Sequence, residues 1–258
     1  MYIDSHCHLD FSVFDKDRGD ILKKCHHHDV RHFIVPGTRF KGWEKQSILS
    51  QEYSSLSMAY GIHPYFLNGE EFRSIDLLGG FCESNFTVAI GEIGLDIWPN
   101  SLPIDIQLAF FRAQLSIAKS LKLPVILHAR RSYDILYKEL KNSHFLYGGA
   151  VHGFSGSWVQ AQRFIELGFV LGIGGNITYT RAKKSIKVIK ELNSVDYVLE
   201  TDSPDMPVFG KQGERNTPLN IPIVAQSISE IRQESIKDIA YQTSINVGRV
   251  FPSIVKGF

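Results

Sequence analysis

The sequence lacks the features that mark several protein classes. Its three cysteines, Cys7, Cys25 and Cys82, are widely spaced and form no C-x-x-C pair, so a disulfide framework is not expected. Lysine and arginine outnumber aspartate and glutamate by one residue, which gives a net charge of +1. Without an overall positive field, an anionic partner has to be bound by local charges.

Long hydrophobic runs are also missing. No apolar stretch approaches the ~20 residues that a membrane-spanning helix needs. The first residues, MYIDSHCH, lack the basic and apolar regions of a secretion signal. We therefore expect a cytoplasmic protein without a membrane partner. No low-complexity linker or charge block divides the 258 residues, so a single domain over 1–258 is expected.

What the sequence does contain is a repeated alternation of short apolar runs and longer amphipathic segments. The apolar runs suit strands that are buried on both faces of a parallel sheet. They are Tyr2–Ser5, Phe33–Pro36, Ser57–Gly61, Val88–Gly91, Val125–His128, Ala150–His152, Phe169–Gly172 and Tyr197–Thr201. Helical patterns occupy 18–29, 43–53, 72–84, 105–122, 132–141, 157–167, 182–193 and 220–232, with a closing helix at 235–250. This order predicts an α/β fold, a (β/α)8 TIM barrel, with a doubly wound open sheet as the alternative.

Polar residues with metal-binding side chains stand at or just past the carboxyl ends of the predicted strands. They are His6, His8, Glu92, His128, His152 and Asp202. In a barrel these ends meet on one face, so the six side chains should converge there. Four imidazoles and two carboxylates are typical of a divalent metal site. Two ions bridged by Glu92 would use the whole set, whereas one ion would leave some residues as supports.

Each of these residues alone has a plainer interpretation. A buried histidine is often a hydrogen-bonded core residue, and an aspartate after a strand is often a helix cap. The joint pattern favours the metal site, because chance seldom puts all six at separate strand ends. Cys7 alternates with His6 and His8 along the strand, so it should point to the opposite face and pack.

Other residues are predicted to contact a substrate. His63 follows the third strand on the same face. Arg130 follows His128 and could bind a phosphate beside the metal. Arg215, in the polar loop 210–218, either reaches over the barrel mouth or is a surface charge. Glu200 lies two residues before Asp202 and so shares its side of the strand, where it could anchor a ligand or be one.

As a set, the motifs of this chain resemble those of the TatD family of metal-dependent hydrolases. In order they are DSHCHLD, GIHP, AIGEIGLD, PVILHAR, VHGFSGS, LETDSPD and GERNTP, and the closing SINVGRVF is similar to the family's last helix. The VHGFSGS and DSPDMP segments look most like the YjjV-type branch. The resemblance runs from residue 4 to residue 251.

The resemblance implies an amidohydrolase-type TIM barrel with two divalent ions, zinc, magnesium or manganese, held by the six residues. It also implies deoxyribonuclease or exonuclease activity, with DNA ends, RNA ends or a small phosphoester as substrate. We expect Asp202 to take a proton from the attacking water. The metal-ligand pattern suits two other functions, hydrolysis of a small ester, amide or lactone, and metal binding without catalysis. A full ligand set argues against the last, since a structural site needs only four ligands.

Overall fold

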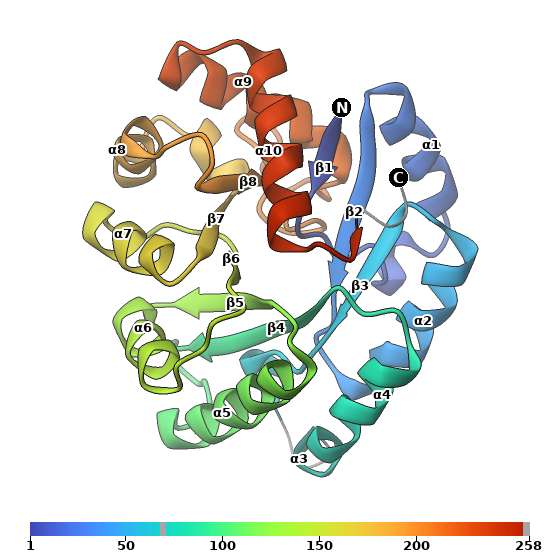
Figure 1. The fold of residues 1–258 in the computed structure, drawn as a ribbon. Coiled ribbons are helices and arrows are strands. Elements are labelled where there is room, and N and C mark those ends of the chain that lie inside the picture. Colours follow the sequence, from blue (N-terminus) through green and yellow to red (C-terminus); the bar gives the residue numbers. More distant parts are fainter. Residues whose placement is uncertain (68–70, 255–258) are drawn as a thin grey trace.

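The computed structural model describes residues 1–67 and 71–254; the expected domain, 1–258, also includes residues outside these ranges. Eight parallel strands follow one another around a single sheet in the order of the sequence (Figure 1). They are β1 (Tyr2–Asp4), β2 (Val30–Pro36), β3 (Leu56–Tyr60), β4 (Ala89–Asp96), β5 (Val125–Arg130), β6 (Gly149–Val151), β7 (Phe169–Ile173) and β8 (Tyr197–Leu199).

The first and last strands meet and close the sheet. The backbone N–H of Ser5, just after β1, donates to the carbonyl of Leu199 in β8 over 2.9 Å. The N–H of Asp202 donates to the carbonyl of His6, also over 2.9 Å. A doubly wound sheet would have two open edges and a reversed strand order. The predicted (β/α)8 TIM barrel is therefore confirmed, and the open sheet is excluded.

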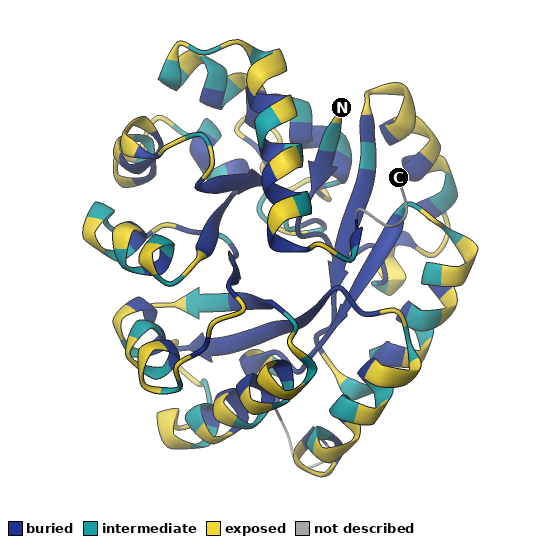
Figure 2. Ribbon diagram, in the orientation of Figure 1, coloured by how far each residue is buried: buried dark blue, intermediate teal, exposed yellow. Residues whose placement is uncertain are grey.

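Helices pack around the strands on the outside of the barrel, and the last one lies across its amino end. They are α1 (Arg18–His27), α2 (Trp43–Glu52), α3 (Glu71–Ser74), α4 (Leu78–Ser84), α5 (Ile104–Leu121), α6 (Tyr133–Asn142), α7 (Trp158–Glu166), α8 (Lys183–Glu191), α9 (Ile221–Arg232) and α10 (Ile236–Val250). The strands are almost entirely buried, whereas each helix has an exposed outer side (Figure 2). The predicted helix 72–84 is interrupted, since a 3-10 turn at Ile75–Leu77 separates α3 from α4. Across the described residues, no helix combines the length and hydropathy of a membrane span.

A layer of small and branched side chains fills the inside of the barrel. Each strand contributes one buried residue to it: Ile3, Ile34, Ala59, Ala89, Ile126, Ala150, Val170 and Val198. Val247 and Val250 of α10 and the following Phe251 belong to the same cluster. The Asn246 side chain of α10 also donates to the carbonyl of Tyr197 over 2.8 Å. Helix α10 therefore covers the amino end of the barrel, and the carboxyl end is left open for a site (Figure 1).

Strand β4 is longer than predicted, and this changes where one site residue lies. The expected strand ended at Gly91, but β4 runs from Ala89 to Asp96, so Glu92 lies within it. The extension pairs with the end of β5, with Gly94 opposite His128. Gly94 has φ +149°, and a Cβ there would lie 2.0 Å from the His128 carbonyl oxygen. Only glycine permits this close approach, which the sequence pattern alone did not reveal.

Candidate metal centre

The six predicted ligand side chains converge at the carboxyl end of the barrel. They line or adjoin one cavity of about 590 Å³, although they come from both ends and the middle of the chain. His6 and His8 follow β1, Glu92 lies in β4 and His128 lies in β5. His152 directly follows β6, and Asp202 lies three residues past β8. Cys7 instead packs in the hydrophobic core, as its alternation with the histidines predicted.

One group of ligand atoms centres on the His6 and His8 rings. Their Nε2 atoms lie 3.3 Å apart. Glu92 Oε2 is 3.1 Å from His6 Nε2 and 3.7 Å from His8 Nε2. Asp202 Oδ1 is 3.6 Å and 3.5 Å from the same two nitrogens. Two imidazole nitrogens and two carboxylate oxygens thus face one small volume, the donor set and crowding that a divalent cation would satisfy.

A second group gathers around the other oxygen of Glu92. Its Oε1 is 2.9 Å from His128 Nδ1 and 3.4 Å from His63 Nε2. The two oxygens of this one carboxylate therefore face two different sets of imidazoles. A carboxylate in this position could bridge two cations.

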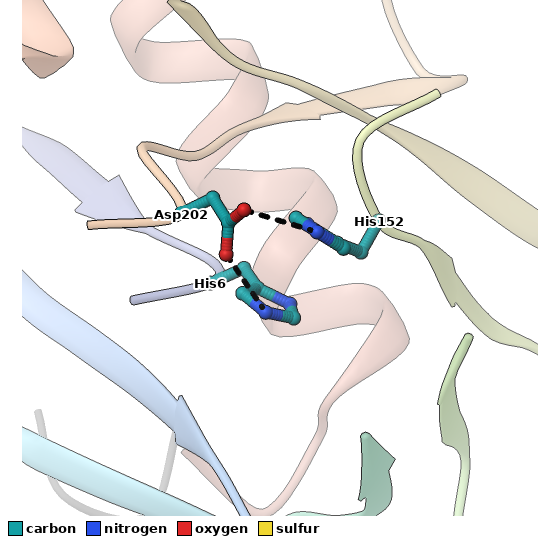
Figure 3. Close-up of side chains that lie close together, drawn as sticks. All are labelled: His6, His152 and Asp202. Atoms are coloured by element: carbon teal, nitrogen blue, oxygen red, sulfur yellow. Dashed lines mark ion pairs between the residues drawn. The ribbon is translucent and has the colours of Figure 1, made fainter. Parts of the chain in front are cut away.

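His152 lies on the far side of the first group. Its Nε2 is 3.6 Å from Asp202 Oδ2, and its ring stacks on His6 with 3.7 Å between centroids. Figure 3 shows Asp202 between the two histidines, with one oxygen directed at each. The opposite nitrogen of His152, Nδ1, is 3.0 Å from Glu200 Oε1. Glu200 also accepts a hydrogen bond from Gly153 N over 2.7 Å, so it fixes the orientation of the imidazole from behind.

The two carboxylates are ionised at neutral pH despite their burial. Burial would raise the pKa of Glu92, but nearby His63, His6 and His152 hold it well below its usual range. Burial opposes ionisation of Asp202 in the same way, yet His152, His8 and His6 bring its pKa to about 2. Both groups are therefore negatively charged acceptors for a cation.

The two histidines of the first group differ in protonation. Burial and the neighbouring His152 lower the pKa of His6, so its imidazole is uncharged at neutral pH. The pKa of His8 is raised to about 9, because Asp202 and Glu92 outweigh burial. Asp202 Oδ1, 3.5 Å from His8 Nε2, stabilises the protonated ring, and a cation bound at that nitrogen would displace the proton.

Asp96 is a site residue that the sequence pattern did not single out. Its Oδ2 is 3.1 Å from His128 Nε2, the ring nitrogen that faces away from Glu92. Asp96 is buried and ends the extended β4 strand. The signal available was its spacing, because residues four apart in a strand share a face and Asp96 follows Glu92 by four.

The predicted substrate contacts have different positions. His63 and Arg130 both line the cavity. The N–H of Tyr65 donates to His63 Nδ1 over 3.0 Å, and burial lowers the pKa of His63 to about 4. His63 is thus a neutral imidazole with its Nε2–H directed inward. Arg130 is 43% exposed at the rim and lies 3.9 Å from Asp96.

Arg215 is not brought to the site. It is not among the residues that line the cavity. Its guanidinium instead donates to Asp17 and, over 2.5 Å, to the carbonyl of Val13. The surface-charge interpretation fits this position, because the ion pair holds the side chain against the loop before α1. Lys211 of the same loop donates to Asn220 over 2.8 Å.

The fold and this convergent set of ligand atoms agree with the comparison to known proteins. Residues 3–252 match the family model described as TatD related DNase. The chain belongs to the TatD family. It is 39% identical over 252 residues to the "uncharacterized metal-dependent hydrolase YjjV" of Escherichia coli K12, with 97% of each chain covered. The crystal structure of E. coli YjjV superposes with a TM-score of 0.94 and covers 97% of this chain and 98% of that one.

A more distant relative carries a specific activity in its name. The "3'-5' ssDNA/RNA exonuclease TatD" of Erwinia amylovora is 27% identical over 250 residues, which cover 94% of this chain and 96% of the relative. Membership of the family makes this TatD protein a metal-dependent hydrolase with buried clusters of histidine, glutamate and aspartate.

Proposed function

We propose that this TatD protein is a phosphodiesterase that cleaves nucleic acid at a centre of two divalent cations, zinc, magnesium or manganese. The observation that carries the proposal is the position of Glu92. Its Oε2 faces His6 and His8, and its Oε1 faces His128 and His63. One cation would use a single oxygen of this carboxylate, whereas two cations would use both oxygens and would share Glu92 as a ligand. His152 and Asp202 complete the ligand set.

Each side chain has a role that follows from its position. Divalent cations, when bound, lower the pKa of a coordinated water and neutralise charge on a phosphoryl group. Asp202 is ionised and lies among the ligand atoms, so it accepts the proton of the attacking water. His63 directs an N–H into the cavity and donates it to a phosphoryl oxygen. Arg130, at the rim, supplies positive charge to the same group.

Glu200 and Asp96 act through their neighbours. Glu200 orients His152 by its contact with Nδ1, and Asp96 orients His128 by its contact with Nε2. Both contacts raise the basicity of the opposite ring nitrogen, which strengthens it as a donor to a cation. The exonuclease name of the E. amylovora relative supports a nucleic acid end, DNA or RNA, as substrate in place of a small phosphoester.

The test is turnover on a substrate panel with the metal content measured on the same samples. The protein is stripped with a chelator and reloaded with Mg²⁺, Mn²⁺ or Zn²⁺. We expect the metal-loaded protein to cleave single-stranded DNA, RNA and bis-p-nitrophenyl phosphate, and the stripped protein to remain inactive until metal is added. Turnover of carboxyl esters or lactones with no cleavage of any phosphodiester would overturn the proposal. Full metal loading with no turnover on any substrate would do the same.

A further inference from the structure

A second hollow of about 700 Å³ adjoins the metal cavity. Tyr65, Phe66 and Arg130 line both, so the two hollows are continuous at the barrel rim. Arg39 and Trp98 line only the second hollow. We call it the rim groove, defined by Arg39, Tyr65, Phe66, Trp98 and Arg130. Its residues come from the loops after β2, β3 and β4 and from the end of β5.

The arginine side chains of the rim groove lie against aromatic rings. The Arg39 guanidinium lies 4.0 Å from the centre of the Phe66 ring. The Arg130 guanidinium lies 3.7 Å from the Trp98 ring, and that of Arg131 lies 4.7 Å from it. A guanidinium stacked on a ring is fixed in place, while the N–H donors around its edge stay available for a phosphate.

These arginines differ from others on the surface. Arg112, Arg163 and Arg215 donate to the carboxylates of Glu139, Asp134 and Asp17. Within residues 1–67 and 71–254, neither Arg39 nor Arg131 forms an ion pair, and Arg130 has Asp96, at 3.9 Å, as its carboxylate neighbour. The rim groove therefore keeps local positive charge in a chain whose net charge is only +1.

The same groove presents aromatic surface to the solvent. The Tyr65 side chain is 66% exposed and Trp98 is 44% exposed. Positive charge interleaved with exposed aromatic rings is the combination that binds single-stranded nucleic acid, since phosphates pair with the cations and unpaired bases stack on the rings. A small ester or lactone would need neither feature beyond the metal cavity.

We infer that the rim groove binds the nucleotides of a single strand that adjoin the phosphodiester at the metal centre. The inference rests on the proposed function for the reaction and adds the surface residues that hold the substrate strand. Arg39 donates to the phosphates of these nucleotides, and Arg130, which lines both hollows, lies between them and the phosphodiester at the metal centre. Tyr65, and the open part of Trp98, stack on bases. A duplex is a weaker ligand, because its bases are already paired and stacked.

Binding tests the groove separately from catalysis. The purified full-length chain with its bound metal is titrated into a fluorescein-labelled single-stranded thymidine 12-mer with phosphorothioate linkages, which resist cleavage, and anisotropy is followed. We expect Trp98→Ala, Tyr65→Ser and Arg39→Gln each to raise the Kd by ~10-fold, the size of one lost stacking or phosphate contact. The wild-type Kd should rise with salt, and a 12-base-pair duplex should bind more weakly than the single strand.

Arg163→Gln is the matched control, since Arg163 also lies over an aromatic ring, that of Tyr137, but on the outer helices. It should bind as the wild type does. Tyr65→Ser keeps the test valid if Trp98→Ala is unstable, because Tyr65 is largely exposed. Unchanged affinity in Tyr65→Ser and Arg39→Gln, an equal loss in Arg163→Gln, or equal binding of duplex and single strand would overturn the inference.

Hydrolysis separates the two proposals. If the wild type cleaves bis-p-nitrophenyl phosphate but the groove variants bind the 12-mer as tightly as the wild type does, the groove inference is rejected and the phosphodiesterase proposal stands. If the groove variants weaken binding of the 12-mer but the fully metal-loaded wild type cleaves no phosphodiester, the groove inference stands and the proposed reaction is rejected. If both hold, the groove variants should lose more kcat/KM on the oligonucleotide than on bis-p-nitrophenyl phosphate.

Discussion

The Asp96 carboxylate lies 3.1 Å from Nε2 of His128, and the other nitrogen of the same ring lies 2.9 Å from Glu92. His128 is thus held between two carboxylates, one in the ligand cluster and one behind it. Because Asp96 fixes which ring nitrogen carries the proton, it decides whether Nδ1 can donate to a cation.

Replacing Asp96 by asparagine should weaken metal binding without unfolding the barrel. Loss of such a partner typically costs ~10–100-fold in metal affinity. Titration calorimetry with Mn²⁺ or Zn²⁺ measures the change, and circular dichroism checks the fold. Asp134→Asn, at an exposed aspartate on α6, is the control and should bind metal normally. Wild-type affinity in Asp96→Asn would remove its orienting role.

Glu92→Ala should lower the metal content more than the loss of a ligand from one group. Its two oxygens face both groups of ligand atoms, so its removal should weaken both cations. His6→Ala combined with His8→Ala removes ligands of one group, so it should lower the metal content and leave the other cation in place. Elemental analysis of the purified variants compares them. Equal metal content in Glu92→Ala and the wild type would contradict a bridging carboxylate.

Asp202→Asn should keep the fold and reduce kcat by ~10²–10⁴-fold, the range for loss of a proton-transfer group. The amide is close to isosteric with the carboxylate but cannot accept the proton. Activity is normalised to bound metal, because Asp202 also faces His6 and His8. Full turnover per metal would exclude Asp202 as the base.

His32 should make stability depend on pH at a place remote from the metal centre. It is buried, accepts or donates a hydrogen bond with Ser57 over 2.8 Å, and burial lowers its pKa to about 4. The unfolded chain takes up this proton near pH 6.5, whereas the folded protein does so only near pH 4. The neutral ring therefore makes its full contribution to the free energy of unfolding above pH 6.5. This contribution falls as the pH drops from 6.5 to 4, by ~3 kcal/mol at most.

The variant His32→Gln isolates this contribution. Glutamine does not titrate, so urea denaturation between pH 7 and pH 4.5 should show a smaller loss of stability than in the wild type. The metal-centre histidines are the same in both proteins and cancel in the comparison. Parallel pH dependence of the two proteins would show that His32 does not titrate as described.

The sequence predicted the barrel and the convergence of the six candidate ligand residues at one end of it, because both depend on local pattern. A buried strand followed by a histidine or carboxylate places that side chain at the carboxyl end whatever the rest of the chain does. The position of Asp96 does not follow from this pattern, because β4 continues past Glu92 and that extension depends on the close approach of Gly94 to β5.

Other features of the structure depend on contacts between residues far apart in the sequence, which a local pattern does not predict. The ion pair between Arg215 and Asp17 joins residues 198 positions apart, and the sequence of the loop 210–218 does not indicate this partner. The rim groove cannot be predicted from the sequence for the same reason, since Arg39, Tyr65, Trp98 and Arg130 come from four separate strand ends. Their spacing in the sequence has no period, so only the closed barrel brings them side by side.

The hydrogen bonds that join β1 to β8 also have a consequence for biosynthesis. His6 and His8 are made early, but Asp202, which faces them, leaves the ribosome almost 200 residues later. The ligand cluster can form only when the last strand docks against the first. Metal uptake should therefore be a late event, and a nascent chain that ends before β8 would leave these two histidines exposed to any cation in its surroundings.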